Sequence, residues 1–319
     1  MKFSHCLNFG QANNNGLISI NDLEKITPAK LNIPCFLMCL PYYVDNKIAN
    51  NKWITDMTEE ERKIDKEKFL LQWFDFYSVL SGQSIVLLLQ PHPDLQDLVY
   101  VNSGAYLPHY KEKDIVILSN FTAEGRAGEE IVLGDFLTKL GYQCIKSPYK
   151  FEGEPELKWL RENIYFGGYG IRSDIKTHEW IEREFGAKII KCEETNEYLY
   201  HLDCSIFVLD EHNIICYTKH FDSKTIKEIE KVANIYDVDE SDALMGICNS
   251  VKCRQTVFNA SSLHNMKKTD KYYEEERKKN EKLVKICKKV GLEVYFFDMS
   301  EAMKSGALLS CFVMHLNYA

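Results

Sequence analysis

The chain has 319 residues, 45% hydrophobic and 12% aromatic, which excludes a chain that is disordered throughout. Its formal net charge of -8 argues against nonspecific binding of nucleic acid. The sequence shows no signal peptide and no apolar run near the roughly 20 residues of a membrane span, so we expect a cytoplasmic protein without membrane contact.

From residue 35 onward, apolar segments typical of strands alternate with amphipathic segments typical of helices. In the first predicted helix, for example, Phe69, Trp73 and Phe76 fall on one face. A strand–helix–strand triplet recurs five times, over 35–40, 59–81 and 84–90; 114–119, 128–140 and 142–145; 164–169, 174–185 and 187–191; 214–218, 224–233 and 235–238; and 256–259, 268–290 and 292–297.

Four further strand-like segments lie between these triplets, over 98–102, 203–209, 243–248 and 311–316. Each unit is therefore close to a ββαβ pattern. A doubly wound parallel sheet is the usual outcome of such alternation. Five units at a spacing of roughly 50–70 residues instead favour a closed pseudo-symmetric ring, with helices outside and short sheets facing a central channel. In such a ring, residues on or just before the further strands would converge on one pocket.

The chain has eleven cysteines, an odd number without any Cys-x-x-Cys pair. This spacing does not indicate a disulfide framework, and most of these residues are expected to be buried small hydrophobes in a reducing compartment. Cys248 and Cys253 have a loosely metal-like spacing, but no second Cys or His pair completes four ligands. We therefore expect no zinc site.

Seven short segments match, in order, the motifs of one known family: Asn51-Lys-Trp-Ile54, Tyr100-Val-Asn-Ser-Gly104, Gly125-Arg-Ala-Gly-Glu129, Phe151-Glu-Gly153, Gly168-Tyr-Gly-Ile-Arg172, His201-Leu-Asp203 and Lys304-Ser-Gly-Ala-Leu-Leu-Ser-Cys311. From about residue 35 to its end, the chain resembles the amidinotransferase and arginine deiminase superfamily, and within it the arginine dihydrolase branch. The resemblance implies the pentein fold, a five-bladed pseudo-symmetric α/β propeller. We expect one catalytic domain over 31–319, preceded by an N-terminal extension over 1–30.

Three residues are expected to carry the chemistry. Cys311 could be one more core cysteine and His201 one more of nine histidines, but Gly306 lets backbone approach a ligand before Cys311. If His201 and Asp203 lie on a strand, their i, i+2 spacing places both on one face. The resemblance implies that Cys311 is the nucleophile, that His201 is the general acid and base, and that Glu152 orients His201.

Substrate contacts follow from charge and from the same resemblance. A carboxylate such as Asp203 accepts two parallel hydrogen bonds from a guanidinium, and Arg126 and Arg172 are candidates for a substrate α-carboxylate. Asn102 stands where arginine deiminases have Asp, which favours a dihydrolase, and Asn51 is expected in the same pocket. The chain departs from the family motif at Gly125, where Glu is usual, and at Pro155-Glu156, where Gly-Asp is usual, which puts a role for Glu156 in doubt.

The sequence therefore predicts a hydrolase that acts on arginine or a related guanidino compound through a covalent amidino-thioether on Cys311, and that releases ammonia. No metal or organic cofactor is expected, and the expected partner is the small guanidino substrate; assembly of identical chains stays open. One alternative is an amidinotransferase, in which an amine resolves the adduct. A second alternative is a non-catalytic pentein binding module, which the departures at Pro155 and Ala307 keep open.

Overall fold

The protein is described by a computed structural model that covers residues 27–110 and 113–319. The strands of these residues form five separate sheets of three strands each. In every sheet, the middle strand pairs with one antiparallel strand and with one parallel strand. The fold is the expected five-bladed α/β propeller of ββαβ units.

Each blade has its antiparallel, middle and parallel strands in that order, with a helix between the last two along the chain. Their bounds are β15 (Met314–His315), β1 (Cys35–Cys39), α3 (Lys66–Ser81) and β2 (Ile85–Leu89); β3 (Gly104–Tyr110), β4 (Lys113–Leu118), α4 (Glu129–Lys139) and β5 (Gln143–Lys146); β6 (Leu157–Arg161), β7 (Ile164–Tyr169), α5 (Ile175–Phe185) and β8 (Lys188–Glu193); β9 (Ile206–Val208), β10 (Asn213–Cys216), α6 (Ser223–Glu230) and β11 (Asn234–Asp237); and β12 (Val251–Cys253), β13 (Thr256–Ala260), α8 (Tyr273–Lys289) and β14 (Glu293–Phe297).

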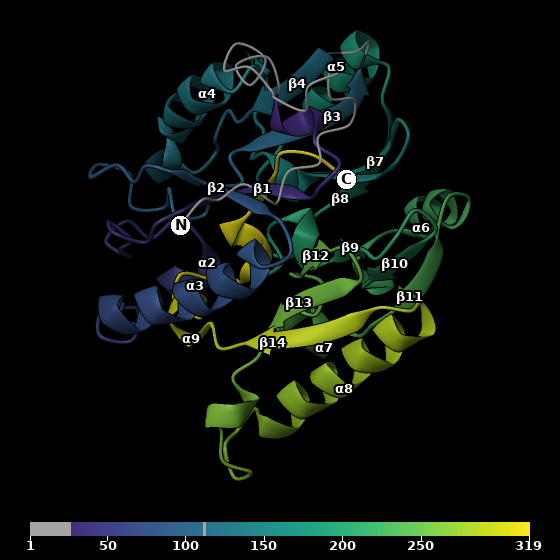
Figure 1. Ribbon diagram of the computed structural model, residues 1–319. Helices are drawn as coiled ribbons and strands as arrows, with labels where there is room; N and C mark the ends of the chain where they lie inside the picture. The colour runs from purple at the N-terminus through teal and green to yellow at the C-terminus, as the bar shows by residue number, and fades with distance from the viewer. Residues whose placement is uncertain (1–26, 111–112) are drawn as a thin grey trace, which may run out of the picture.

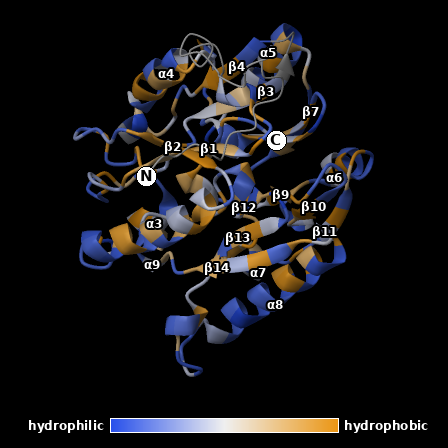
Figure 2. Cartoon of the chain, in the orientation of Figure 1, coloured by the Kyte–Doolittle hydropathy of each residue, from blue (hydrophilic) through white to orange (hydrophobic). Residues whose placement is uncertain are grey.

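The five predicted triplets are confirmed, and the largest error in them is the start of α3. The helix was expected from residue 59 but begins at Lys66, because the Asp65 side chain accepts a hydrogen bond from the Lys68 backbone N–H and caps the helix there. Phe69, Trp73 and Phe76 are buried, as their spacing predicts. Figure 2 shows α8 as the more polar of the two helices and α3 as the more apolar. The apolar residues of α3 are not confined to its buried face, because Leu70, Leu71 and Phe74 are exposed.

The predicted further strands are only partly correct. The strand expected over 98–102 is wrong, because the chain forms turns there and the antiparallel strand of that blade is β3. The strand expected over 243–248 is also wrong. Asp239 and Asp242 form a capping box that starts the short helix α7 (Glu240–Leu244), and the antiparallel strand β12 follows at Val251. The antiparallel strand β6 was not expected at all.

The first blade closes the ring, because its strands come from both ends of the chain. β1 pairs with β2 in parallel and with the C-terminal strand β15 in antiparallel, with Phe36 opposite His315 and Leu37 opposite Met314. Figure 1 shows the C-terminus beside β1, with α3, α4, α5, α6 and α8 on the outside of the molecule. The ring therefore brings segments about one hundred residues apart in sequence toward one another.

Buried apolar side chains form five clusters that are shared between elements of neighbouring blades. One of them combines Phe36 of β1, Trp73 of α3, Phe258 of β13 and Phe312 near the C-terminus. Among the described helices, none has both the length and the hydropathy needed to cross a bilayer. Most of the expected N-terminal extension, residues 1–26, lies outside the described residues, and residues 28–30 form a short 3-10 helix.

Candidate active site

The expected catalytic residues lie in the segments that lead into the antiparallel strands. Asn102 precedes β3, Glu152 precedes β6, His201 and Asp203 precede β9, and Cys311 precedes β15. Because these strands occupy equivalent places in four blades, the segments meet at one end of the ring. They surround a cavity of about 30 Å³ whose walls include Asn51, Asn102, Arg126, Arg172, His201 and Cys311.

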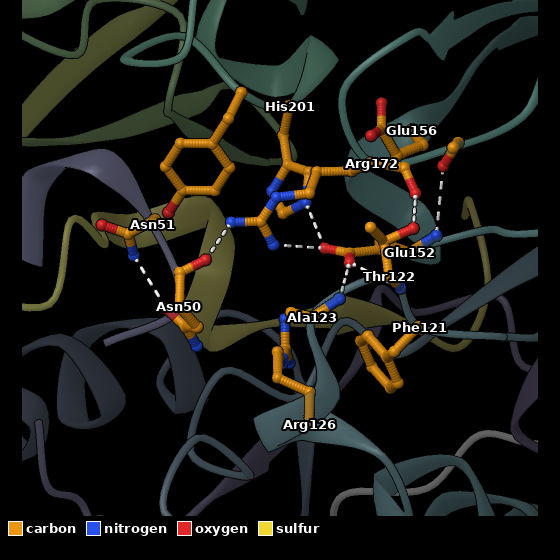
Figure 3. Close-up of polar contacts among 12 residues, drawn as sticks. Asn50, Asn51, Phe121, Thr122, Ala123, Arg126, Glu152, Glu156, Arg172 and His201 are labelled. Atoms are coloured by element: carbon orange, nitrogen blue, oxygen red, sulfur yellow. Dashed lines mark hydrogen bonds and ion pairs between the residues drawn. The ribbon is translucent and has the colours of Figure 1, made fainter. Parts of the chain in front are cut away.

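Glu152 does not line the cavity but contacts His201, which does (Figure 3). Its buried carboxylate accepts hydrogen bonds from His201 Nε2 and Arg172 Nη1, each at 2.9 Å, and from the backbone N–H groups of Thr122 and Ala123 at 3.1 and 3.0 Å. Burial would raise the pKa of Glu152, but the His201 hydrogen bond and the Arg172 charge hold it well below its usual range. The expected contact between Glu152 and His201 is therefore present.

The local geometry of His201 and Asp203 differs from the expectation. His201 is the residue before a 3-10 helix, Leu202–Cys204, and Asp203 lies within that helix. The strand β9 begins only at Ile206, so the two side chains do not share a strand face. The 3-10 turn instead directs His201 to Glu152 and Asp203 to Ser310, whose Oγ donates a hydrogen bond of 2.5 Å to Asp203 Oδ2.

Cys311 is half-buried and lies in the 3-10 helix Leu309–Phe312. Burial and the neighbouring carboxylate of Asp203 together raise the pKa of its thiol to about 11. The sulfur accepts a hydrogen bond of 3.8 Å from Asn249 Nδ2. Since the thiolate is the reactive form, the free protein holds Cys311 in its less reactive state, and an added positive charge in the cavity would favour the thiolate.

Both candidate arginines are buried and already have protein partners. Arg126 donates two hydrogen bonds to the Glu129 carboxylate, at 3.0 Å from Nε and 2.7 Å from Nη2. Arg172 binds Glu152 through Nη1 and donates from Nη2 to the Asn50 carbonyl at 2.5 Å. Two nitrogens of Arg126 are held by the Glu129 carboxylate, whereas Arg172 donates to a carboxylate from one nitrogen and only to a backbone carbonyl from another. Arg172, which also lies over the Tyr200 ring, is therefore the stronger candidate for a substrate carboxylate.

Asn51 and Asn102 both lie on the cavity wall, but Asn51 also has a structural role. Its Oδ1 accepts a hydrogen bond from the Ile54 N–H and caps α2 (Lys52–Thr55), and its Nδ2 donates to the Ser305 carbonyl. Asn51 thereby links α2 to the segment that precedes Cys311. Asn102 is buried, and its backbone carbonyl accepts from the N–H of Glu154.

Three residues at the site were missed from the sequence: Asp97, Glu194 and Asn249. Asp97 lines the cavity, and burial raises its pKa to about 7. Its position five residues before Asn102 was the available signal. Asn249 stands just before the antiparallel strand of the fifth blade, the place that the expected site residues occupy in the other blades. No local pattern singles out Glu194.

Glu194 forms a buried pair with Glu156, the residue whose role the sequence put in doubt. Pro155 starts a 3-10 helix with Glu154 and Glu156, and this turn buries the Glu156 side chain completely. The two carboxyl groups lie close enough to shift each other's pKa, and no described group donates a hydrogen bond to Glu156 Oε1 or to either oxygen of Glu194. A proton shared between the two carboxyl groups would satisfy these oxygens. Burial raises the pKa of Glu156 to about 7 and that of Glu194 well above its usual range. Within the described residues, no group of three His, Cys, Asp or Glu side chains is placed to hold a metal ion.

No protein-family model matches the sequence. The chain is 27% identical over 288 residues to the bifunctional arginine dihydrolase/ornithine cyclodeaminase AgrE of Nostoc sp., which covers 88% of this chain and 37% of that protein. It is 27% identical over 196 residues to the N(G),N(G)-dimethylarginine dimethylaminohydrolase of Mycobacterium tuberculosis, covering 61% of this chain and 62% of that protein. The chain thus spans about a third to two thirds of these relatives.

Solved structures with the same fold include AgrE in a ternary complex with ornithine and NAD⁺. That structure has a TM-score of 0.77 at 25% identity and covers 90% of this chain and 39% of its own. The N-terminal domain of ArgZ bound to its product has a TM-score of 0.77 at 24% identity, with 89% of this chain and 98% of that domain covered.

Proposed function

We propose that this chain, which has the pentein fold and is similar to arginine dihydrolases, hydrolyses the guanidino group of arginine or a related compound. The observation that carries the proposal is the meeting of Cys311 and His201 on one buried cavity, with Glu152 hydrogen-bonded to His201 at 2.9 Å. A nucleophile and an oriented acid–base group on one wall are what covalent catalysis at a carbon centre requires.

In the proposed reaction, the Cys311 sulfur attacks the guanidinium carbon, and the cationic substrate favours the thiolate. His201 protonates the departing nitrogen, which leaves as ammonia, and an amidino-thioether remains on Cys311. Water, deprotonated by His201, then attacks the same carbon, and the carbon–sulfur bond breaks to give the ureido product and the free thiol. Attack on that product in a second cycle would give ornithine, carbon dioxide and more ammonia, and we propose that the neutral amide of Asn102 permits it.

Recognition of the amino-acid end is assigned to Arg172 and Asp97. Arg172 offers a positive charge for the substrate α-carboxylate, and Asp97 offers a carboxyl group for the α-ammonium group. Burial raises the pKa of Asp97 to about 7, so an ammonium group placed beside it would favour its charged form. These contacts support an amino acid with a guanidino group as the substrate.

Substrate entry requires a rearrangement of the cavity walls, since a cavity of about 30 Å³ holds no more than about two or three water molecules. A second cavity of about 520 Å³ shares Asn50, Asn51, Arg172 and Tyr200 with the small one. The hydrogen bond between Arg172 and the Asn50 carbonyl lies where the two cavities adjoin. We propose that the large cavity is the entrance, and that the substrate carboxylate takes Arg172 from Asn50.

The test is ammonia release from arginine by the full chain and by the Cys311→Ala variant. We expect the variant to lose activity by at least about three orders of magnitude, because no other described thiol lines the cavity. Cys144→Ala is the matched control, since Cys144 is also half-buried but lies in β5. An unchanged rate for Cys311→Ala would contradict the covalent mechanism.

The products formed from arginine distinguish a dihydrolase from a deiminase and from an amidinotransferase. Two ammonia per arginine with ornithine indicate a dihydrolase, and one ammonia with accumulating citrulline indicates a deiminase. Guanidinoacetate formed from arginine and added glycine would instead indicate an amidinotransferase. Mass spectrometry of acid-quenched protein should detect the adduct on the peptide that contains Cys311.

A further inference from the structure

The fifth blade contributes a residue to the site that the proposed reaction has not yet used. Asn249 stands two positions before β12, as Asn102 stands two positions before β3. It is buried, at 4% relative exposure. With Asn249 included, each blade supplies a polar side chain from the segment that leads into its antiparallel strand.

The amide nitrogen of Asn249 lies between two groups that the reaction needs as anions. Its Nδ2 is 3.8 Å from the Cys311 sulfur and 3.5 Å from Asp203 Oδ2. A carboxamide nitrogen carries two hydrogens and can donate one to each neighbour. A carboxylate and a thiolate at this separation repel each other, so a shared neutral donor stabilises both without cancelling the charge that attracts a guanidinium.

Ser310 determines which way the Asn249 amide points. The backbone N–H of Ser310 donates to Asn249 Oδ1 at 3.1 Å, so the amide oxygen faces Ser310 and the amide nitrogen faces the sulfur. The Ser310 hydroxyl donates to Asp203 Oδ2 at 2.5 Å, which holds the carboxylate beside the same amide. Asn249 itself is anchored by its backbone N–H, which donates to the Gly246 carbonyl at 3.2 Å.

We propose that Asn249 is a further catalytic residue, which holds the Cys311 sulfur and the Asp203 carboxylate side by side by donating one amide hydrogen to each, and that Ser310 is the positioning residue that orients this amide. The catalytic role of Asn249 rests on the proposed function, because Asn249 is assigned to the step in which Cys311 attacks the substrate. Its geometry, however, can be tested on the free protein without any substrate.

The first experiment measures the rate at which iodoacetamide alkylates Cys311 as a function of pH, followed on the Cys311 peptide by mass spectrometry. In Asn249→Ala the midpoint of this profile should rise by roughly one pH unit or more, because a hydrogen bond to the charged sulfur is lost. Asn102→Ala is the matched control, since it removes another buried amide of the site that has no hydrogen bond to the sulfur; its midpoint should stay at the wild-type value.

Other titratable groups around Cys311 are unchanged in these variants, namely Asp203, Arg126, Tyr100, Tyr200, Cys204 and His201. A difference between variant and wild type therefore reports on the amide. If Asn249→Ala does not fold, Asn249→Ser replaces it, because a serine hydroxyl is too short to reach the sulfur. Equal midpoints in the wild type and the folded variant, or equal shifts in Asn249→Ala and Asn102→Ala, would overturn the proposal.

The second experiment uses arginine turnover. For Asn249→Ala, we expect kcat/KM to fall by roughly tenfold or more near pH 7 and to approach the wild-type value as pH rises, because the thiol then ionises without help. A purely structural role would give a deficit that does not shrink with pH. Ser310→Ala keeps the backbone N–H that orients the amide and removes only the hydroxyl bond that holds Asp203, so it should mainly raise KM. Ser310→Thr, which keeps the hydroxyl, should restore KM. Should the wild type fail to turn over arginine, the proposed function fails while the alkylation result still stands.

Discussion

At the scale of single residues, the ionisation of the side chains in the site depends on whether a cationic substrate is bound. Glu152 is held as a carboxylate by His201 and Arg172, whereas the Cys311 thiol is held protonated by burial and by Asp203. The proposed nucleophile, Cys311, is therefore weak until a cation enters. This arrangement suits a guanidinium substrate, because the same positive charge that Asp203 attracts also favours the thiolate.

The buried pair of Glu156 and Glu194 gives a prediction on pH and stability. Burial raises both pKa values above those of the unfolded chain, so the stability contribution is complete below about pH 4.5 and is lost as pH rises through about 7. In Glu194→Gln the amide donates to Glu156 without a proton from solution. We expect the loss of thermal stability between about pH 5 and pH 8 to be smaller in this variant than in the wild type.

The control for this pair is Glu230→Gln, which changes an exposed glutamate on α6. Its melting temperatures, measured by circular dichroism at the same pH values, should follow those of the wild type. If Glu194→Gln also follows the wild type, the two carboxyl groups do not share a proton in the folded state.

At the scale of elements, each site residue is placed by a turn and not by the strand that follows it. His201 and Asp203 lie at a 3-10 turn, Cys311 lies in another, and Asn249 follows α7 through a turn at Gly246. A turn allows side chains two residues apart to point in different directions, whereas in a strand such side chains point to the same face. This is why the expected strand over 203–209 described the wrong relation between His201 and Asp203 while both residues still reached the site.

Gly246 packs against the Leu308 side chain, which must shift if Gly246 gains a Cβ. Its φ is +77°, and an added Cβ would come within 2.1 Å of Leu308 Cδ1, close to Cys311 in sequence. Gly186 is the matched control, because its φ is +68° and an added Cβ would meet nothing within 4 Å. We expect Gly186→Ala to cost about 1 kcal/mol from backbone strain alone, and Gly246→Ala about 2 kcal/mol, because the Leu308 side chain must also shift.

Urea unfolding of the two variants would measure both values. Gly246→Ala should in addition lower kcat, because the displaced turn carries Asn249 with it, whereas Gly186→Ala should keep wild-type turnover. Equal destabilisation by the two substitutions would show that the contact with Leu308 relaxes without cost.

At the scale of the whole molecule, the site depends on the closure of the ring by the first blade. Asn317 joins the two ends: its Oδ1 accepts from the Cys35 N–H at 2.9 Å, and its Nδ2 lies 3.0 Å from each of the carbonyls of Pro28, Leu31 and Ile33. Closure fixes the segment that carries Cys311, because β15 begins only three residues after it.

Asn317→Ala should therefore be strongly destabilising. The substitution leaves a buried N–H and several carbonyl groups without their partner, and we expect a loss of roughly 3–5 kcal/mol in the free energy of unfolding. Asn265→Ala, at an exposed asparagine whose side chain donates to Asp298, should change stability by less than about 1 kcal/mol. Comparable values for the two variants in denaturant unfolding would contradict the role of Asn317 in closing the ring.

The sequence by itself determined the five strand–helix–strand units and most residues of the proposed site, because strand and helix periodicity is local and because Cys311, His201, Asp203 and Glu152 stand in recognisable motifs. Only the tertiary structure decided where the short antiparallel strands lie, since their pairing depends on partners in other parts of the chain and not on their own pattern. The tertiary structure alone also revealed Asn249, Asp97 and Glu194. Their importance comes from the atoms they face, and those atoms belong to residues distant in the sequence.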